Sequence, residues 1–167
     1  MKHRYAKVTM LFAIAAIVSV CSARGASWPE NGGQQLEGTW ELQIGLQDCS
    51  SGSPVGAPFR SLLTFAQGGT MTETTANPMF FPAVRGPGHG AWIQTGHHTY
   101  KATSTAFITV NGALTRIQTI AQTIEIGRDD VFKTDAASVK FFQPDGTLVA
   151  TGCAAAIGKR IEVTREP

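Results

Sequence analysis

The most regular pattern in the chain is an alternation of apolar and polar positions that begins after Gly38. Every second residue from position 40 to position 46 is apolar: Trp40, Leu42, Ile44 and Leu46. The positions between them carry polar or small side chains. Because successive side chains of a strand point to opposite faces, this period of two predicts a strand with one buried and one solvated face.

Similar patterns, separated by turn signals, cover most of the remaining chain. Strands are predicted at residues 59–65, 70–75, 91–95, 98–109, 113–126, 131–143 and 147–163. The connections include Gly68-Gly69, Asn111-Gly112 and Asp145-Gly146, which suit tight hairpins. No segment has the apolar stripe and caps of a helix. The predicted fold class is all-β, an eight-stranded antiparallel meander, and closing it into an up-and-down barrel removes both exposed edges.

Two segments interrupt this pattern. Residues 48–58 are rich in Ser, Gly and Pro, which predicts a loop. Residues 76–90 contain three prolines and three glycines, which exclude a regular element, yet Met79, Phe80, Phe81 and Val84 are apolar. A long apolar loop in a compact domain is either a lid or binding loop, or a plug for one end of the core. The sequence is compatible with both.

Closure of the barrel places the first strand antiparallel to the last. Cys49 then lies near Cys153, and a disulfide between them is expected in an exported chain, the alternative being two separate buried thiols. At the other end of the same strand pair Arg160 approaches Trp40, where it can form a cation–π contact. Trp40 and Arg160 are therefore predicted to be structural residues that close the barrel.

Gly38-Thr39-Trp40, with Arg160 near the end of the last strand, resembles the calycin superfamily of lipocalins and avidins. In those families a Gly-x-Trp strand packs beneath a basic residue from the C-terminal part of the chain. The resemblance implies a calycin-like barrel and no particular ligand, because the later lipocalin motifs and the biotin-contacting set of streptavidin are not recognisable here. The layout is also similar to the eight-stranded barrels of allene oxide cyclases and dirigent proteins.

The first 25 residues have the order of a secretory signal peptide. A basic head with Lys2, Arg4 and Lys7 precedes an apolar run at residues 8–20 and then small residues. The run is shorter than the ~20 residues that a membrane-spanning helix needs. A lipid anchor on Cys21 is the other alternative. The protein is thus predicted to be secreted or periplasmic, with a flexible leader at 26–36 and one barrel domain at 37–167.

The signal peptide also carries the apparent basicity of the chain. Four of the 14 Lys and Arg residues, and none of the 12 acidic residues, lie at or before residue 25, so the mature chain has a net charge of −2. This charge gives no reason to expect nucleic acid as a partner. No stable membrane span is expected in the mature chain either.

Few residues have the pattern of a catalytic or metal site. His97 and His98 are adjacent, so in a strand they point to opposite faces, and no third ligand accompanies His89; no metal site is predicted. The candidate acids and bases are Glu73, Asp135 and His98. For each acid two outcomes are open: burial inside the barrel, or return to solvent through a bulge. The glycines at 86, 88 and 90 lack the following helix of a dinucleotide loop.

The predicted interior mixes large with small side chains, such as Ala102, Ser104, Ala106 and Ala137, which favours a cavity over a filled core. The main hypothesis is therefore an exported barrel that binds a small hydrophobic molecule without a cofactor. An isomerase, cyclase or hydratase that needs no cofactor is the alternative, and a structural module with a filled core is a third. The predicted ligand-binding residues are Phe65, Met79, Phe80, Phe81, Trp92, His98, Tyr100 and Phe141.

Overall fold

The computed structural model describes residues 35–163, apart from the side chain of Asp129. The proposed signal peptide and residues 26–34 of the leader lie outside this range. The strands are β1 (Gly38–Gln47), β2 (Pro54–Ala66), β3 (Thr70–Thr75), β4 (Val84–Arg85), β5 (Gly88–Gln94), β6 (Thr99–Val110), β7 (Ala113–Ile126), β8 (Val131–Phe142) and β9 (Leu148–Arg160). Two short 3-10 turns, η2 (Pro78–Phe80) and η3 (Arg128–Asp130), complete the described elements.

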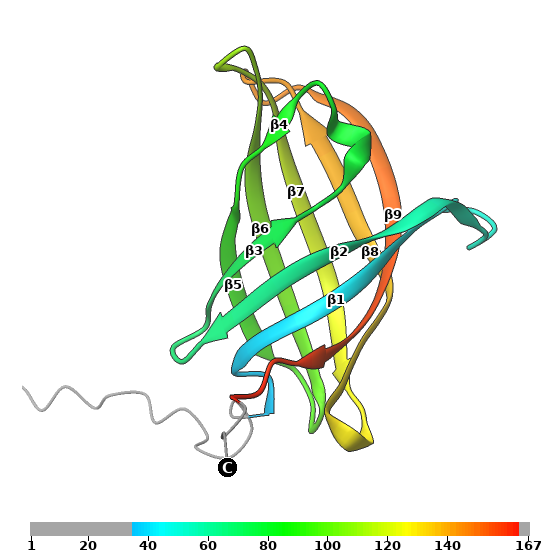
Figure 1. The fold of residues 1–167 in the computed structure, drawn as a ribbon, viewed down its shortest axis with the longest axis vertical. Helices are drawn as coiled ribbons and strands as arrows, with labels where there is room; N and C mark the ends of the chain where they lie inside the picture. The colour runs from blue at the N-terminus through cyan, green and yellow to red at the C-terminus, as the bar shows by residue number, and fades with distance from the viewer. Residues whose placement is uncertain (1–34, 164–167) are drawn as a thin grey trace, which may run out of the picture.

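The strands form one closed antiparallel sheet (Figure 1). Each long strand pairs with its neighbours in the order β1, β2, β3, β5, β6, β7, β8, β9, and β9 returns to β1. The predicted all-β fold, an eight-stranded up-and-down barrel, is therefore confirmed. The two-residue strand β4 is an addition, and it pairs with β6 beyond the point where β5 ends its own pairing.

One end of the barrel, here called the Trp40 end, is filled by aromatic side chains. In Figure 1 it is the lower end, where β1 begins and β9 finishes. The Trp40 ring lies 5.7 Å from that of Phe132, and the Phe65 ring lies 6.2 Å from both Phe132 and Trp92. Tyr100 packs against Trp92 at 5.9 Å. Such tilted, edge-to-face and stacked contacts add to the burial of large apolar surfaces, so this end is a solid core.

The pairing of β1 with β9 forms the seam of the barrel. Trp40 lies opposite Arg160, whose guanidinium is centred 4.4 Å from the indole centroid. Arg160 also donates to the carbonyl of Glu37 and lies 3.6 Å from a carboxylate oxygen of Asp130. Gly38 has φ +117°, and a Cβ there would be 2.7 Å from Nη1 of Arg160. The Gly-x-Trp motif thus leaves room for the arginine that covers the tryptophan.

Leu36, the last residue of the predicted leader, is fully buried in the core of the Trp40 end. The indole nitrogen of Trp40 donates to the Leu36 carbonyl at 2.9 Å. The segment before β1 therefore provides the hydrogen-bond acceptor for the one polar atom of the Trp40 side chain. The Leu36 side chain also covers the end of the core. No periodic pattern marked Leu36, since it stands outside the alternation of β1.

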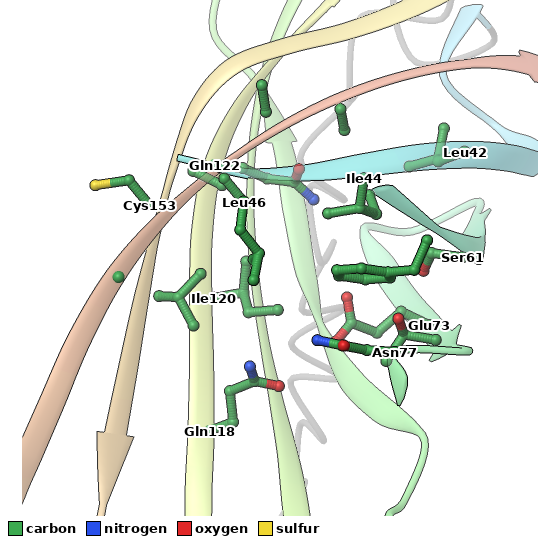
Figure 2. A pocket seen from close by; sticks show the side chains of 18 of the residues that line it. Leu42, Ile44, Leu46, Ser61, Glu73, Asn77, Gln118, Ile120, Gln122 and Cys153 are labelled. Carbon is green, nitrogen blue, oxygen red and sulfur yellow. The ribbon is translucent and has the colours of Figure 1, made fainter. Parts of the chain in front are cut away.

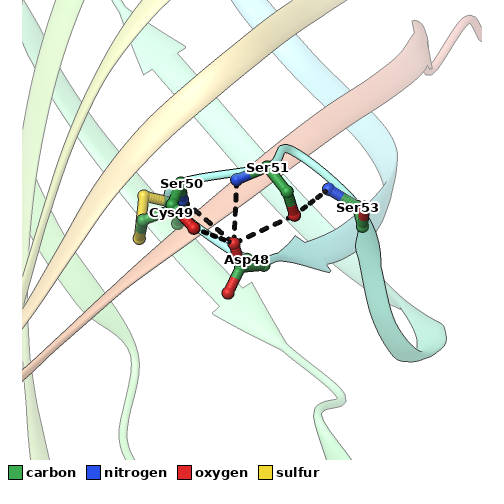
Figure 3. Close-up of a disulfide and its surroundings, with 6 residues drawn as sticks. Asp48, Cys49, Ser50, Ser51 and Ser53 are labelled. Carbon is green, nitrogen blue, oxygen red and sulfur yellow. Dashed lines mark hydrogen bonds between the residues drawn. A yellow bond between two sulfur atoms is a disulfide. The ribbon is translucent and has the colours of Figure 1, made fainter.

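The opposite end of the seam, here called the Cys49 end, is closed by the expected disulfide (Figure 3). Cys49 and Cys153 are bonded with a Cα–Cα separation of 5.2 Å. The bond links positions 104 residues apart, and in the chain-entropy model a loop of this size contributes a few kcal/mol. Beside it, Asp48 accepts hydrogen bonds from the backbone and hydroxyl groups of Ser50 and Ser51. These bonds, with the Ser50 hydroxyl first, lower the pKa of Asp48 to about 2.

Two loop predictions were wrong in part. β2 begins at Pro54 rather than at residue 59, and its first residues pair only with β1. Proline is tolerated in a strand where its missing N–H faces no partner. The Ser, Gly and Pro content of residues 48–58 therefore did not exclude a strand from Pro54 onward. Residues 76–90, expected to lack regular structure, contain η2, β4 and the start of β5. A strand of two residues bonded to one neighbour leaves no periodic signal in a sequence.

Candidate functional site

A cavity of about 390 Å³ occupies the Cys49 end of the barrel (Figure 2). Leu42 and Leu63 separate it from the aromatic core, and it reaches the surface beside the exposed Val55 and Met79. Its wall is formed mainly by inward positions of β1, β2, β3, β7, β8 and β9. The apolar part of the wall consists of Leu42, Ile44, Leu46, Val55, Phe59, Leu63, Met79, Phe80, Ile120, Ala137, Val139, Phe141, Ala154, Ala155 and Ala156.

The cavity exists because small residues occupy one part of the wall. Ala154 and Ala156 of β9 point inward opposite β1, and Ala137 of β8 lies beside them. The sequence predicted the role of Ala137 correctly. Ala102, by contrast, packs into the aromatic core, and neither Ser104 nor Ala106 lines the cavity. Small residues on β6 therefore accommodate neighbouring side chains, whereas those on β8 and β9 leave space.

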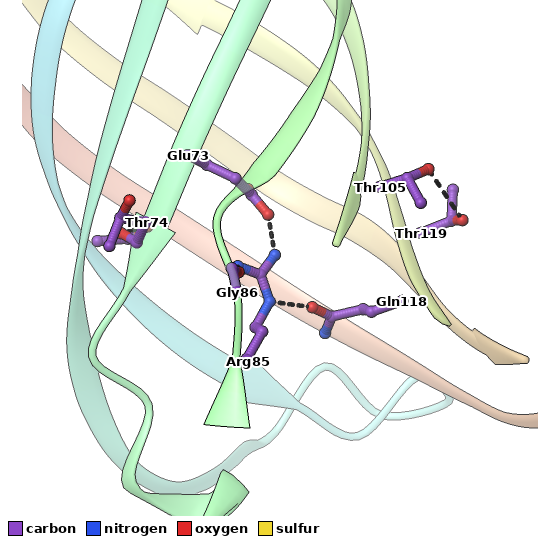
Figure 4. Close-up of polar contacts among 8 residues, drawn as sticks. Glu73, Thr74, Arg85, Gly86, Thr105, Gln118 and Thr119 are labelled. Carbon is purple, nitrogen blue, oxygen red and sulfur yellow. Dashed lines mark hydrogen bonds and ion pairs between the residues drawn. The ribbon is translucent and has the colours of Figure 1, made fainter. Parts of the chain in front are cut away.

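A polar cluster of Glu73, Arg85 and Gln118 interrupts the apolar wall (Figure 4). Arg85 of β4 donates to a carboxylate oxygen of Glu73 on β3 and to the side-chain oxygen of Gln118 on β7. It also donates to the Gly86 carbonyl at 3.2 Å. The side chains of Arg85 and Glu73 are only 3% and 6% exposed. Each charge compensates the other, so removing either one would leave a buried charge unpaired.

Gly88 explains how Glu73 fits inside the barrel. The two residues lie opposite each other in the pairing of β3 with β5. A Cβ at Gly88 would be 2.5 Å from Cγ of Glu73. Gly88 belongs to the glycine-rich segment that the sequence did not identify as a dinucleotide loop. Its role is in packing, because it leaves the space that the buried Glu73 side chain occupies.

The three candidate acids and bases have different environments. Glu73 is buried in the cavity, whereas Asp135 is 73% exposed and pairs with Lys133 at 2.9 Å. The register of β8 against β9 shifts between Thr134 and Ala137, and this bulge turns Asp135 outward. Return to solvent is therefore correct for Asp135 and wrong for Glu73. His98 is exposed at the Trp40 end, where Nδ1 lies 2.6 Å from Oε1 of Gln35.

The histidines are not arranged as the alternation suggested. His97 and His98 precede β6 in a turn, so their rings face each other at 4.1 Å instead of pointing to opposite faces. His89 is exposed on β5. Among residues 35–163, no group of three His, Cys, Asp or Glu side chains is placed to hold a metal ion. The same part of the chain contains no helix long and apolar enough to cross a membrane.

The predicted ligand-binding residues fall into three groups. Met79, Phe80 and Phe141 line the cavity. Phe65, Trp92 and Tyr100 belong to the aromatic core of the Trp40 end and do not line it. Phe81 is 87% exposed and, like His98, lies outside the wall. Burial raises the pKa of the Tyr100 hydroxyl, against an opposing effect of Arg160. Aromatic side chains thus fill the Trp40 end, whereas the cavity is lined mainly by aliphatic side chains together with Phe59, Phe80 and Phe141.

Sequence reasoning missed Arg85 and Gln118, which hold the centre of the polar cluster. Gln118 shares the inward phase of β7 with Ile120, Gln122 and Ile124, so a glutamine in an apolar register was an available signal. Arg85 had no such signal, because it lies in the irregular segment before β5. Only the pairing of β4 with β6 directs its side chain into the cavity.

Comparison of the chain with protein-family models and with curated proteins found no match.

Proposed function

We propose that this protein binds a small, largely apolar molecule in the cavity at the Cys49 end of its barrel. The observation that carries the proposal is the cavity itself, about 390 Å³ in volume, with an apolar wall and one buried polar cluster. Pockets for small molecules typically combine such a wall with a few oriented polar groups. A barrel with a filled interior, the third hypothesis from the sequence, does not fit this geometry.

The loop and the disulfide support the same proposal. Met79 and Phe80 of the apolar segment 76–90 form part of the wall, as a binding loop would, and do not plug the core. The disulfide at Cys49 holds β1 and β9 together beside the cavity and is compatible with an extracellular or periplasmic protein. Export through a cleaved signal peptide remains part of the proposal.

Catalysis without a cofactor is the second candidate, because Glu73 and Arg85 are two ionisable groups that converge inside the cavity. Binding is favoured, since the pair already has a structural role in which Arg85 is engaged by Glu73, Gln118 and a backbone carbonyl. An arginine stays protonated in proteins and therefore cannot act as a general base. Native mass spectrometry of protein purified from its source distinguishes a retained ligand from a substrate that turns over.

The test of binding is a titration with N-phenyl-1-naphthylamine, an uncharged dye whose fluorescence rises in apolar surroundings. The wild-type protein is expected to bind it saturably. Ala154→Phe places a ring in the cavity from a wall position and is expected to abolish this binding. Ala121→Phe makes the same change on an exposed position of β7 and should bind the dye like the wild type.

Circular dichroism spectra of both variants show whether the barrel is retained. Two results would overturn the proposal: no saturable binding by the wild type, or equal binding by a folded Ala154→Phe variant.

A further inference from the structure

The polar cluster has hydrogen-bonding capacity that the protein does not use. Glu73 accepts from Arg85 through Oε1, and its Oε2 has no donor among the described residues. Gln118 accepts from Arg85 through its side-chain oxygen. Because a guanidinium only donates, this contact determines which end of the Gln118 amide is oxygen. The amide nitrogen then has no acceptor within residues 35–163.

The two unused atoms belong to side chains held by the same guanidinium. Arg85 binds Glu73 through Nη2 and Gln118 through Nε, so one guanidinium lies between the two side chains and holds both in the cavity wall (Figure 4). One unused atom is an acceptor and the other is a donor. A hydroxyl group satisfies both, because it donates one hydrogen bond and accepts others.

Among the other polar side chains of the wall, the Thr75 hydroxyl is buried and has no hydrogen-bond partner in the described part of the chain, whereas three others are engaged. Gln122 accepts from Thr134 at 3.3 Å, and Asn77 accepts from the backbone of Met79 at 3.0 Å. Ser61 donates to the Thr74 carbonyl at 3.0 Å. Glu73 carries the one carboxylate of the described wall, and a hydrogen bond to a charged group is stronger than one to a hydroxyl, so Glu73 is the strongest acceptor there for a donor from a ligand.

The charges of the cluster disfavour a charged ligand. Glu73 and Arg85 already cancel, so a ligand carboxylate would enter beside an acceptor to which it cannot donate. A ligand ammonium would enter beside the Arg85 guanidinium. Either ion would also lose its hydration without gaining an opposite charge of its own. An uncharged polar group has neither cost.

We propose that the ligand of this cavity is an uncharged alcohol, with its hydroxyl on Glu73 and Gln118 and its apolar body along the aliphatic wall. This inference rests on the proposed function, because it names the class of molecule that the same cavity takes. It further implies that Glu73 and Gln118 determine the preference for the head group, while the wall determines the size and shape of the apolar part.

The first experiment is competition against N-phenyl-1-naphthylamine bound to the wild-type protein. The competitors share one alkyl chain and differ in the head group: 1-decanol, its methyl ether, decanoate and decylammonium. The ether accepts a hydrogen bond but cannot donate one to Glu73. 1-Decanol is expected to displace the dye at a concentration about tenfold lower than the ether, as for one hydrogen bond to a charged group. It should also outcompete both ions.

The second experiment removes the cluster while keeping the cavity apolar. Glu73→Met combined with Arg85→Met replaces the ion pair by side chains of similar length, a change that buried pairs often tolerate. The variant should bind the dye and lose the difference between 1-decanol and its ether. The control combines Glu41→Gln with Arg60→Gln, an exposed Glu–Arg pair on the outer face, and should keep that difference. Gln118→Met, which removes only the amide, serves if the double variant does not fold.

The outcomes separate this inference from the proposed function. Saturable dye binding with equal displacement by alcohol and ether, or with decanoate as the best competitor, overturns the alcohol and leaves binding in place. A folded variant without the cluster that still prefers the alcohol also overturns the inference. Failure of the wild type to bind the dye overturns both.

Discussion

The two ends of the barrel are built from the same strands, yet one is a solid core and the other holds a cavity. On β1 the inward residue at the Trp40 end is Trp40 itself, whereas Ile44 and Leu46 point inward at the Cys49 end. On β8 the corresponding change is from Phe132 to Ala137. Along the seam the pairing of β1 with β9 runs without a register shift from Trp40 to Gln47, so the difference there arises from side-chain volume. Closing the barrel and making room in it are thus separate properties of one sheet.

The strongest way to break this comparison is Trp40→Ala at the solid end. Trp40 is fully buried, packs on Phe132 and lies beneath Arg160. We expect the free energy of unfolding to fall by about 5 kcal/mol, the upper range for truncating a buried aromatic residue. Phe141→Ala in the cavity wall should cost clearly less, because one side of Phe141 has no packing partner. Urea unfolding followed by far-ultraviolet circular dichroism measures both, and equal losses would contradict the distinction between the ends.

The next largest effect is expected from separating the buried charges. Glu73→Leu leaves Arg85 unpaired and should lower the free energy of unfolding by about 4 kcal/mol. The double variant Glu73→Met and Arg85→Met should recover most of this loss, since it removes both charges. Denaturant unfolding of the two variants and the wild type tests this. A double variant less stable than Glu73→Leu would show that the pair itself, rather than the unpaired charge, determines stability.

Removing the disulfide tests the seam at the Cys49 end. Changing both Cys49 and Cys153 to Ser should lower the free energy of unfolding by about 3 kcal/mol, mainly because the unfolded chain gains freedom. The pairing of β1 with β9 continues to Arg160, so the barrel should still close. Dye binding should therefore persist in the folded variant. Complete loss of the fold would mean that strand pairing alone does not maintain the seam.

The smallest expected effect is the pH response of the exposed Asp48 turn. Its pKa of about 2 lies below the ordinary value of 3.8, so its hydrogen bonds contribute stability above pH 3.8. That contribution should disappear as the pH falls from 3.8 towards 2. Asp48→Asn should unfold like the wild type at low pH and slightly more easily near neutrality. Thermal unfolding across this range measures the difference, and a constant difference at every pH would contradict it.

Much of the architecture could be predicted because its causes are local. The alternation around Trp40 and the turn at Asn111-Gly112 specify strands and hairpins through neighbouring residues. The closure of the meander then brought Cys49 to Cys153 and Arg160 to Trp40, both of which are in contact. The errors arose where local signals are weak, at the start of β2 and in the segment that contains β4.

The site could be predicted only in part. Met79, Phe80 and Phe141 line the cavity, but Phe65 and Trp92 do not, because the alternation shows that a side chain points inward and not at which height. The height depends on how each strand is staggered against its neighbours. In a regular strand Asp135 would share the inward face of Val139 and Phe141. The bulge in β8 turns its side chain outward instead.

By itself the sequence determined a closed antiparallel barrel with a disulfide at one end of its seam and a covered tryptophan at the other, because these follow from residue period, turn chemistry and chain order. Only the tertiary structure decided that the small residues of β8 and β9 face a cavity and that Arg85 joins Glu73 to Gln118 within it. The three residues of this cluster come from β3, β4 and β7. Their meeting depends on the registers of several strand pairs together, and no single stretch of the chain contains that information.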